Sequence, residues 1–228
     1  MSEGDLIAQP LLIVCAGGYA RETAALLGED ERWRLLGFAD DDEELHGADV
    51  GGLPVLGSPE QAIAEAPHAL VVVCQARTFS DDRRRLVARL ALSADRYATV
   101  VHRTASVGGA ATIGPGSVLL SGVVMTSEVS IGSHVAVMPG SVLLHDVTIE
   151  DYVTLAAGAR IGGGVRVEQG AYVGMGALLR DGITVGAGAL VGMGAVVTRS
   201  VPPGEVWFGA PARAHGNVTD PAVRRLAE

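Results

Sequence analysis

The residues best suited to acid–base chemistry are His145 and Asp146, which lie in a stretch where polar side chains are scarce. A histidine outside a core can act as a general base near neutral pH, and a neighbouring carboxylate holds its tautomer and raises its basicity. Eighteen residues later, Gly163 lies in an all-glycine run, residues 162–164, whose N–H groups we expect to be unshielded. Such an N–H can stabilise an oxyanion. The pattern predicts a base with an oxyanion donor; the alternative is a histidine that is merely exposed.

The other histidines carry a weaker signal. We expect His134 and His215 to be solvated and His102 to cap the start of a repeat region, with His134 as the second candidate for a base. Three histidines at the spacing of a zinc site are not evident, so the sequence predicts no metal centre.

A repeat of six residues must position the His145 pair. From Val101 to Val197 an aliphatic residue or Met recurs at every sixth position, giving seventeen hexads without a slip. The fourth residue after each is also small or aliphatic. This period fits a short strand and a turn repeated around a triangular prism, so that three hexads form one coil and residues 18 apart stack. The pattern predicts a parallel β-helix and leaves its handedness open.

The first hundred residues alternate apolar runs with helical stretches, which is typical of a parallel α/β sheet. The turn Gly17-Gly18 between a strand and a helix is suited to bind a phosphate or diphosphate. Asp40 and Asp41 end the second strand, where they could recognise a ribose or base or form a solvated acidic turn. Cys15 and Ala20 break the dinucleotide fingerprint, so we do not expect NAD.

Composition excludes several classes of protein. The chain is 48% hydrophobic and 19% charged with a net charge of −9, which excludes a disordered chain and a nucleic-acid-binding surface. The apolar runs are too short for membrane insertion, and the two cysteines lie in apolar runs, which predicts reduced thiols and a cytoplasmic location. We expect domains at 1–100 and 101–205 and a C-terminal extension with a short helix at 206–228.

The arrangement resembles the bacterial sugar acyltransferases of the sialic-acid O-acetyltransferase and bacillosamine N-acetyltransferase type. The segments that carry the resemblance are the hexads, residues 16–22, 37–41 and 52–57, Val101-His102, His145-Asp146 and residues 209–213. It implies a small Rossmann-like nucleotide-sugar domain followed by a left-handed β-helix. It also implies an acyltransferase that moves an acyl group from acetyl-CoA, or another acyl-CoA, to an amine or hydroxyl of a nucleotide-linked amino sugar or related carbohydrate.

The resemblance also assigns roles to residues. His145 becomes the base, Asp146 orients it, and Gly163 stabilises the thioester oxyanion. The acyl-CoA co-substrate would lie between two subunits of a homotrimer, against Gly174, Met175, Gly192, Gly194 and Arg213. Nucleotide recognition falls to Gly17, Gly18, Tyr19, Asp40 and Asp41.

The chain departs from the family pattern at several positions. Thr154 stands where a second histidine is usual, and Met138 stands where an asparagine is common in the preceding coil. The identity of the sugar, the acylated atom and the acyl group therefore stay open. The alternative function is a catalytically weak, trimeric subunit that binds sugar nucleotides or serves assembly.

Overall fold

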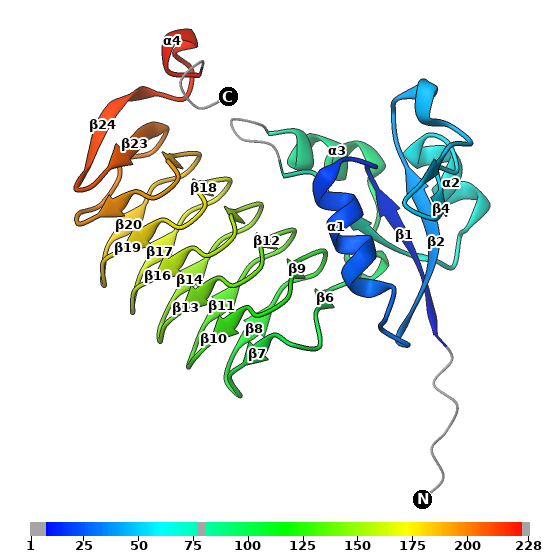
Figure 1. The fold of residues 1–228 in the computed structure, drawn as a ribbon, viewed down its shortest axis with the longest axis horizontal. Helices are drawn as coiled ribbons and strands as arrows, with labels where there is room; N and C mark the ends of the chain where they lie inside the picture. Colours follow the sequence, from blue (N-terminus) through cyan, green and yellow to red (C-terminus); the bar gives the residue numbers. More distant parts are fainter. Residues whose placement is uncertain (1–7, 77–80, 225–228) are drawn as a thin grey trace, which may run out of the picture. The chain divides into compact units, whose positions relative to one another are not determined.

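The computed structural model describes residues 8–76 and 81–224, drawn in Figure 1. These residues form two compact units: residues 8–75 and 82–98 make the N-terminal unit, and residues 99–224, with Ala76 and Asp81, make the C-terminal unit. The N-terminal unit is a Rossmann-like α/β domain with a three-stranded parallel sheet in the order β2-β1-β5. Its elements are β1 (Gln9–Val14), α1 (Gly18–Leu27), β2 (Trp33–Ala39), β3 (Asp49–Val50), β4 (Leu53–Pro54), α2 (Pro59–Glu65), β5 (Leu70–Val73), α3 (Asp82–Leu90) and two 3-10 helices, Glu43–Leu45 and Ala94–Arg96.

The pattern of apolar residues explains how this unit packs. On β1, Leu12 and Val14 are fully buried and belong to clusters that include residues of α2 and α3, while α1 packs against β1 and β2. Helix α2 begins where the sequence favours it, because the Ser58 side chain accepts the N–H of Gln61 and proline occupies the first helical position.

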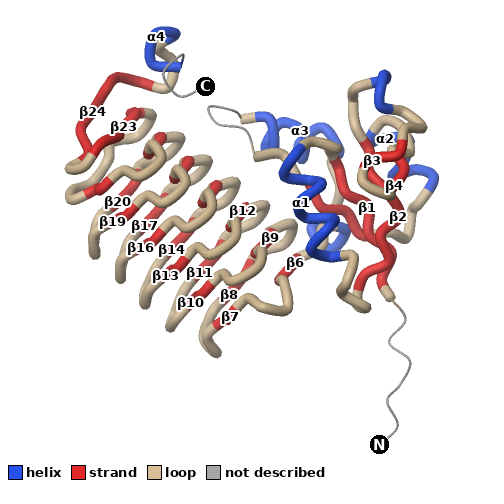
Figure 2. Tube along the Cα trace, viewed as in Figure 1, coloured by secondary structure: helices blue, strands red, loops and turns tan. Residues whose placement is uncertain are grey.

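The C-terminal unit is a left-handed β-helix of about six turns whose core strands are two residues long. Figure 2 shows these strands alternating with turns. The strands are β6 (Val100–Val101), β7 (Ser106–Val107), β8 (Thr112–Ile113), β9 (Val118–Leu119), β10 (Val124–Met125), β11 (Ser130–Ile131), β12 (Ala136–Val137), β13 (Val142–Leu143), β14 (Thr148–Ile149), β15 (Thr154–Leu155), β16 (Arg160–Ile161), β17 (Arg166–Val167), β18 (Tyr172–Val173), β19 (Leu178–Leu179), β20 (Thr184–Val185), β21 (Leu190–Val191) and β22 (Val196–Val197).

Inside the array each strand pairs in parallel with the strands 18 residues before and after it, as in Leu143↔Ile161, and the strands at its two ends have such a partner on one side only. This pairing confirms the predicted parallel β-helix. The first residue of almost every hexad is buried in one continuous core, together with the fourth residue after it. The residue three after each core aliphatic residue repeatedly takes a positive φ, as at Gly140 and Gly158, which favours glycine there. Burial and turn conformation together account for the six-residue period.

The end of the chain continues one face of the solenoid. Strand β23 (Glu205–Gly209) pairs in parallel with β21 and antiparallel with β24 (Ala212–Asn217), and α4 (Pro221–Arg224) follows. Trp207 is buried in the solenoid core, so this hairpin closes the last coil.

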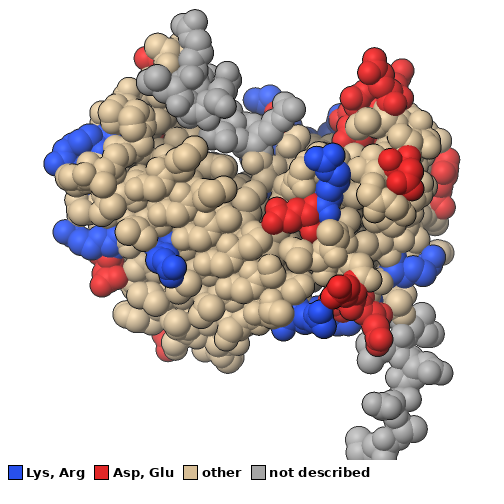
Figure 3. All heavy atoms as spheres, viewed as in Figure 1, with Lys and Arg blue, Asp and Glu red and all other residues tan. Residues whose placement is uncertain are grey.

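Charge is spread unevenly between the units. Figure 3 shows many acidic side chains on the N-terminal unit, whereas the visible face of the solenoid is mostly uncharged with scattered arginines. The full chain carries 17 Arg and 26 acidic residues.

No helix in the described part of the chain is long and apolar enough to span a membrane.

Candidate active site

The turn after β13 presents His145 and Asp146 to solvent, with 66% and 57% of the two side chains exposed. Asp146 has a φ of 59°, in the left-handed region that aspartate tolerates better than most residues. Its Oδ2 lies 2.7 Å from His145 Nδ1. This hydrogen bond, with the charge of Asp146, raises the pKa of His145 above its ordinary value. Because a carboxylate accepts, Nδ1 carries the proton and Nε2 keeps a lone pair that can take another.

Gly163 lies one coil further at the same corner of the prism, directly beside the His145 ring. A Cβ atom at position 163 would lie 2.6 Å from both Cε1 and Nε2 of the imidazole, so the histidine can stand here only against glycine. The Gly163 N–H, however, donates to Asp181 Oδ1 over 2.9 Å. The expectation of an unshielded N–H is therefore wrong, because a side chain from the next coil reaches back to it.

Asp181 is the residue that sequence reasoning missed. It also raises the pKa of His145, as a smaller contribution than that of Asp146. The 18-residue step that places Gly163 beside His145 places Asp181 beside Gly163, so the signal was available in the repeat.

The structure corrects the expectation for His134. Its side chain is only 6% exposed, and its ring stacks on Tyr152 with centroids 5.3 Å apart. On the other side it lies over Gly116, where a Cβ atom would be 2.3 Å from His134 Nδ1. His134 is thus sandwiched between two coils. His215 is exposed and stacks on Phe208.

Four of the residues predicted to contact acyl-CoA, Gly174, Met175, Gly192 and Gly194, lie at another corner of the prism. We call it the methionine corner and define it as these four residues together with Met193. Met175 and Met193 stack one coil apart and are 61% and 81% exposed, which is unusual for large apolar side chains. The glycines let the chain pack closely, since a Cβ at Gly174 would meet Met193 N at 2.5 Å. Arg213 lies exposed on β24.

In the N-terminal unit, the carboxyl ends of the parallel strands bring the Gly17-Gly18 turn and Asp40 together. Asp40 Oδ2 accepts the N–H of Ala16 over 2.7 Å, and its Oδ1 accepts the N–H of Asp42 over 3.0 Å. Asp40 thus holds the end of β2 against the turn after β1. Asp41 is exposed and pairs with Arg89 at 2.8 Å.

The backbone conformation and the surroundings of positions 17 and 18 do not require glycine. Gly17 has an ordinary φ of −71°, neither residue is in the left-handed region, and a Cβ atom at either position would meet nothing within 4 Å. The N-terminal N–H groups of α1 are therefore open to a bulky group.

Tyr19 and the two cysteines differ from this open turn because their polar groups are buried. The Tyr19 hydroxyl is buried, and this burial raises its pKa well above its ordinary value. A direct substrate contact by this hydroxyl disagrees with that burial. Burial also raises the pKa of the free thiols Cys15 and Cys74 to about 12, so neither is a thiolate nucleophile near pH 7.

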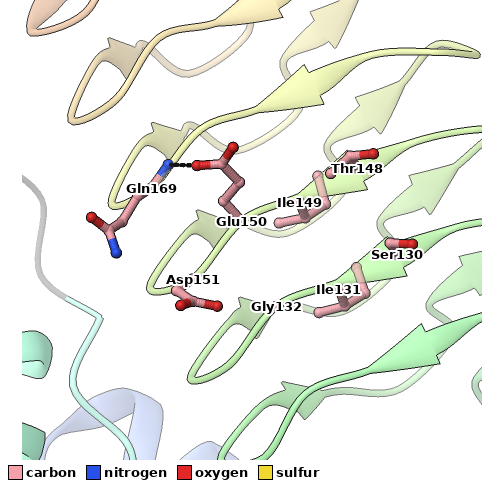
Figure 4. A pocket seen from close by; sticks show the side chains of 8 residues that line it. All are labelled: Ser130, Ile131, Gly132, Thr148, Ile149, Glu150, Asp151 and Gln169. Carbon is pink, nitrogen blue, oxygen red and sulfur yellow. Dashed lines mark hydrogen bonds between the residues drawn. The ribbon is translucent and has the colours of Figure 1, made fainter.

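A surface pocket of about 330 Å³ lies on another part of the solenoid, beside β11 and β14 (Figure 4). Its carboxylates bind the solenoid itself: Asp151 Oδ1 accepts the N–H of Ser133 over 2.7 Å, and Glu150 accepts the N–H of Gln169 and contacts Arg166. These contacts give the pocket's acids a structural role.

The described residues contain no cluster of His, Cys, Asp and Glu able to hold a metal ion.

Two family models match the chain. Residues 10–90 match the PglD N-terminal domain, and residues 128–163 match the bacterial transferase hexapeptide repeat. WeeI from Acinetobacter baumannii AYE is 31% identical, with 91% of this chain and 100% of that chain covered and a TM-score of 0.79. The chain belongs to the hexapeptide-repeat family of bacterial sugar acyltransferases. No curated protein matches it.

Two further members of this acyltransferase family have been solved with ligands. A mutant of GDP-perosamine N-acetyltransferase from Caulobacter crescentus, in complex with CoA and GDP-perosamine, is 25% identical with a TM-score of 0.80, covering 91% of this chain and 97% of that one. The acetyltransferase domain of PglB from Neisseria gonorrhoeae FA1090, in complex with acetyl coenzyme A, is 26% identical with a TM-score of 0.78, covering 91% and 99%.

Proposed function

We propose that this protein is an acyl-CoA-dependent acyltransferase, with acetyl-CoA as the first candidate donor, that acylates an amine or hydroxyl of a nucleotide-linked amino sugar or related carbohydrate. The observation that carries the proposal is the exposed His145-Asp146 pair at a turn of a hexapeptide-repeat solenoid. The relatives solved with CoA, acetyl-CoA and GDP-perosamine support the same class of reaction.

In this proposal His145 Nε2 removes the proton of the acceptor amine or hydroxyl while that atom attacks the thioester carbonyl carbon. A bond forms between acceptor and acyl carbon, and the carbonyl oxygen becomes an oxyanion that the Gly163 N–H stabilises once Asp181 has released it. Collapse of this intermediate breaks the carbon–sulfur bond. The imidazolium returns its proton to the departing CoA sulfur, so that His145 ends neutral, and Asp146 stabilises its charged state in between.

The acyl-CoA would lie along the methionine corner, where Met175 and Met193 offer apolar surface, with the exposed Arg213 available for the phosphates. In a homotrimer the methionine corner of one subunit can face the His145 turn of the next, which a single prism cannot achieve because these are different corners. We expect sedimentation at micromolar concentration to give the mass of three chains. A stable monomer would remove the shared site.

Gly17, Gly18 and the N-terminus of α1 would hold the nucleotide diphosphate, with Asp40 and Asp41 at the neighbouring strand end. We expect Gly18→Ala to weaken binding of nucleotide-linked sugars, because a methyl group enters the open space, while thermal stability stays equal or rises, because alanine favours a helix. Gly28→Ala at the other end of α1 is the matched control. Equal affinity in both variants, measured by calorimetry, would place the nucleotide elsewhere.

The function is tested by following free thiol release from acetyl-CoA with a panel of UDP-, GDP-, dTDP- and CMP-linked amino sugars. Acceptor-dependent thiol release is the expected result. Tight binding of a sugar nucleotide without thiol release from any acyl-CoA would instead favour the non-catalytic binding subunit, for which Thr154 in place of the second family histidine is the motivating observation.

A further inference from the structure

Three residues form a column along one corner of the prism: His145, Gly163 and Asp181, each one coil after the last. Pairing of β13 with β16 and of β16 with β19 fixes this register. The imidazole occupies the space that a Cβ atom at position 163 would need, and the Gly163 N–H donates to Asp181 Oδ1 over 2.9 Å. In this state the backbone donor beside the base is occupied by a carboxylate.

Carboxylate caps of this kind recur in the solenoid. The N–H two residues after a core aliphatic residue is also capped at Ser133 by Asp151 over 2.7 Å, at Gln169 by Glu150 over 3.0 Å and at Ala187 by Glu168 over 2.9 Å. A buried or half-buried N–H needs an acceptor, so the cap has a structural purpose. At Gly163 the same kind of cap, made by Asp181, occupies an N–H donor that lies beside His145.

We infer that Asp181 gates the oxyanion donor: its carboxylate occupies the position that the thioester oxygen must take on the Gly163 N–H, and it leaves when acyl-CoA binds. This inference rests on the proposed function. One N–H cannot serve two acceptors at full strength, and a carboxylate beside a developing oxyanion would oppose the negative charge that the reaction creates.

Arg199 provides a destination for the displaced carboxylate. It occupies the same position one coil after Asp181, as the pairing of Leu179 with Val197 shows. In this structure its guanidinium carbon lies 5.0 Å from the centroid of the Trp207 ring, on a strand of a different sheet, so the side chain must turn away from that ring to meet the carboxylate. An aspartate that leaves Gly163 in this direction exchanges a backbone N–H for a cation.

The test compares the affinities of acetyl-CoA and of CoA for the full-length protein by calorimetry, since CoA lacks the thioester oxygen. In Asp181→Ala the thioester oxygen of acetyl-CoA displaces only water from the Gly163 N–H, whereas in the wild type it must displace a carboxylate. We therefore expect the preference for acetyl-CoA over CoA to rise about three- to tenfold, the size expected when a hydrogen bond to a charged group is no longer lost. Asp181→Asn, which keeps an acceptor without the charge, should give an intermediate rise.

Asp151→Ala is the matched control, because it removes an equivalent cap from Ser133 at another corner and should leave the preference unchanged. The inference is overturned if Asp181→Ala leaves the preference as in the wild type, lowers it, or changes it no more than Asp151→Ala does. If Asp181→Ala does not fold, Asp181→Asn decides by the same criterion. Failure of the wild-type protein to bind either ligand would count against the proposed function itself.

Discussion

His145→Ala should lower turnover by about 10² to 10⁴, the usual contribution of a positioned general base. The affinity for acyl-CoA should hardly change, because the imidazole acts on the acceptor proton in the transition state. Steady-state kinetics with the acceptor found by thiol release would separate kcat from KM. The fold and the proposed homotrimer should persist, since the side chain is 66% exposed in the single chain.

Asp146→Asn should cost less than the loss of the histidine, because Asp146 orients the base and does not touch the acceptor. It also has a defined effect on pH dependence. Asp146 raises the pKa of His145, and the base must be neutral to accept a proton, so activity falls as pH drops through that raised pKa. Removing the charge lowers the pKa, so the acid limb of kcat/KM should move to lower pH.

His68→Ala, at an exposed position of the N-terminal unit, is the control for a histidine substitution without effect. Near-normal turnover in His145→Ala would mean that proximity alone carries the reaction or that the base lies elsewhere. The buried ring of His134 makes it a poor replacement, because its contacts with Gly116 and Tyr152 leave it little access to an acceptor.

The repeat made the fold predictable because each position of the hexad has its own physical requirement. Core aliphatic residues such as Leu143 and Ile161 are fully or almost fully buried, and the turn residue after them needs a positive φ. The 18-residue register also predicts from the sequence alone that Gly163 lies beside His145. The six-residue period does not determine the handedness of the coil, which was predicted from the family resemblance instead.

Side-chain reach was the part that the sequence could not settle. Asp181 and Ser127 occupy the same position of their hexads as His145, and nothing in the residue types says that the aspartate turns back to Gly163. His134 looked like a polar turn residue, yet the missing side chain at Gly116 makes room for its ring. Neighbours one coil away, rather than neighbours in sequence, decide exposure in a solenoid.

Gly163→Ala should reduce turnover by about 10², because an ångström-scale displacement of a catalytic group has a cost of that order. The new Cβ atom would lie 2.6 Å from Cε1 and Nε2 of His145, and the exposed imidazole is the group free to move. Gly163 has no positive φ, so its backbone accepts alanine without strain, and thermal stability should change little. Once the ring loses Asp146, the pKa of His145 measured by NMR should fall toward its ordinary value.

Gly109→Ala is the matched control, since Gly109 holds the same hexad position at the same corner and a Cβ there meets nothing within 4 Å. The double variant His145→Ala/Gly163→Ala identifies the route of the effect. If the alanine methyl acts only by displacing the imidazole, the double variant should be as slow as His145→Ala alone, because two changes acting through one group do not add. An additive loss would contradict this, and it would mean that the methyl group obstructs the acceptor or the thioester directly.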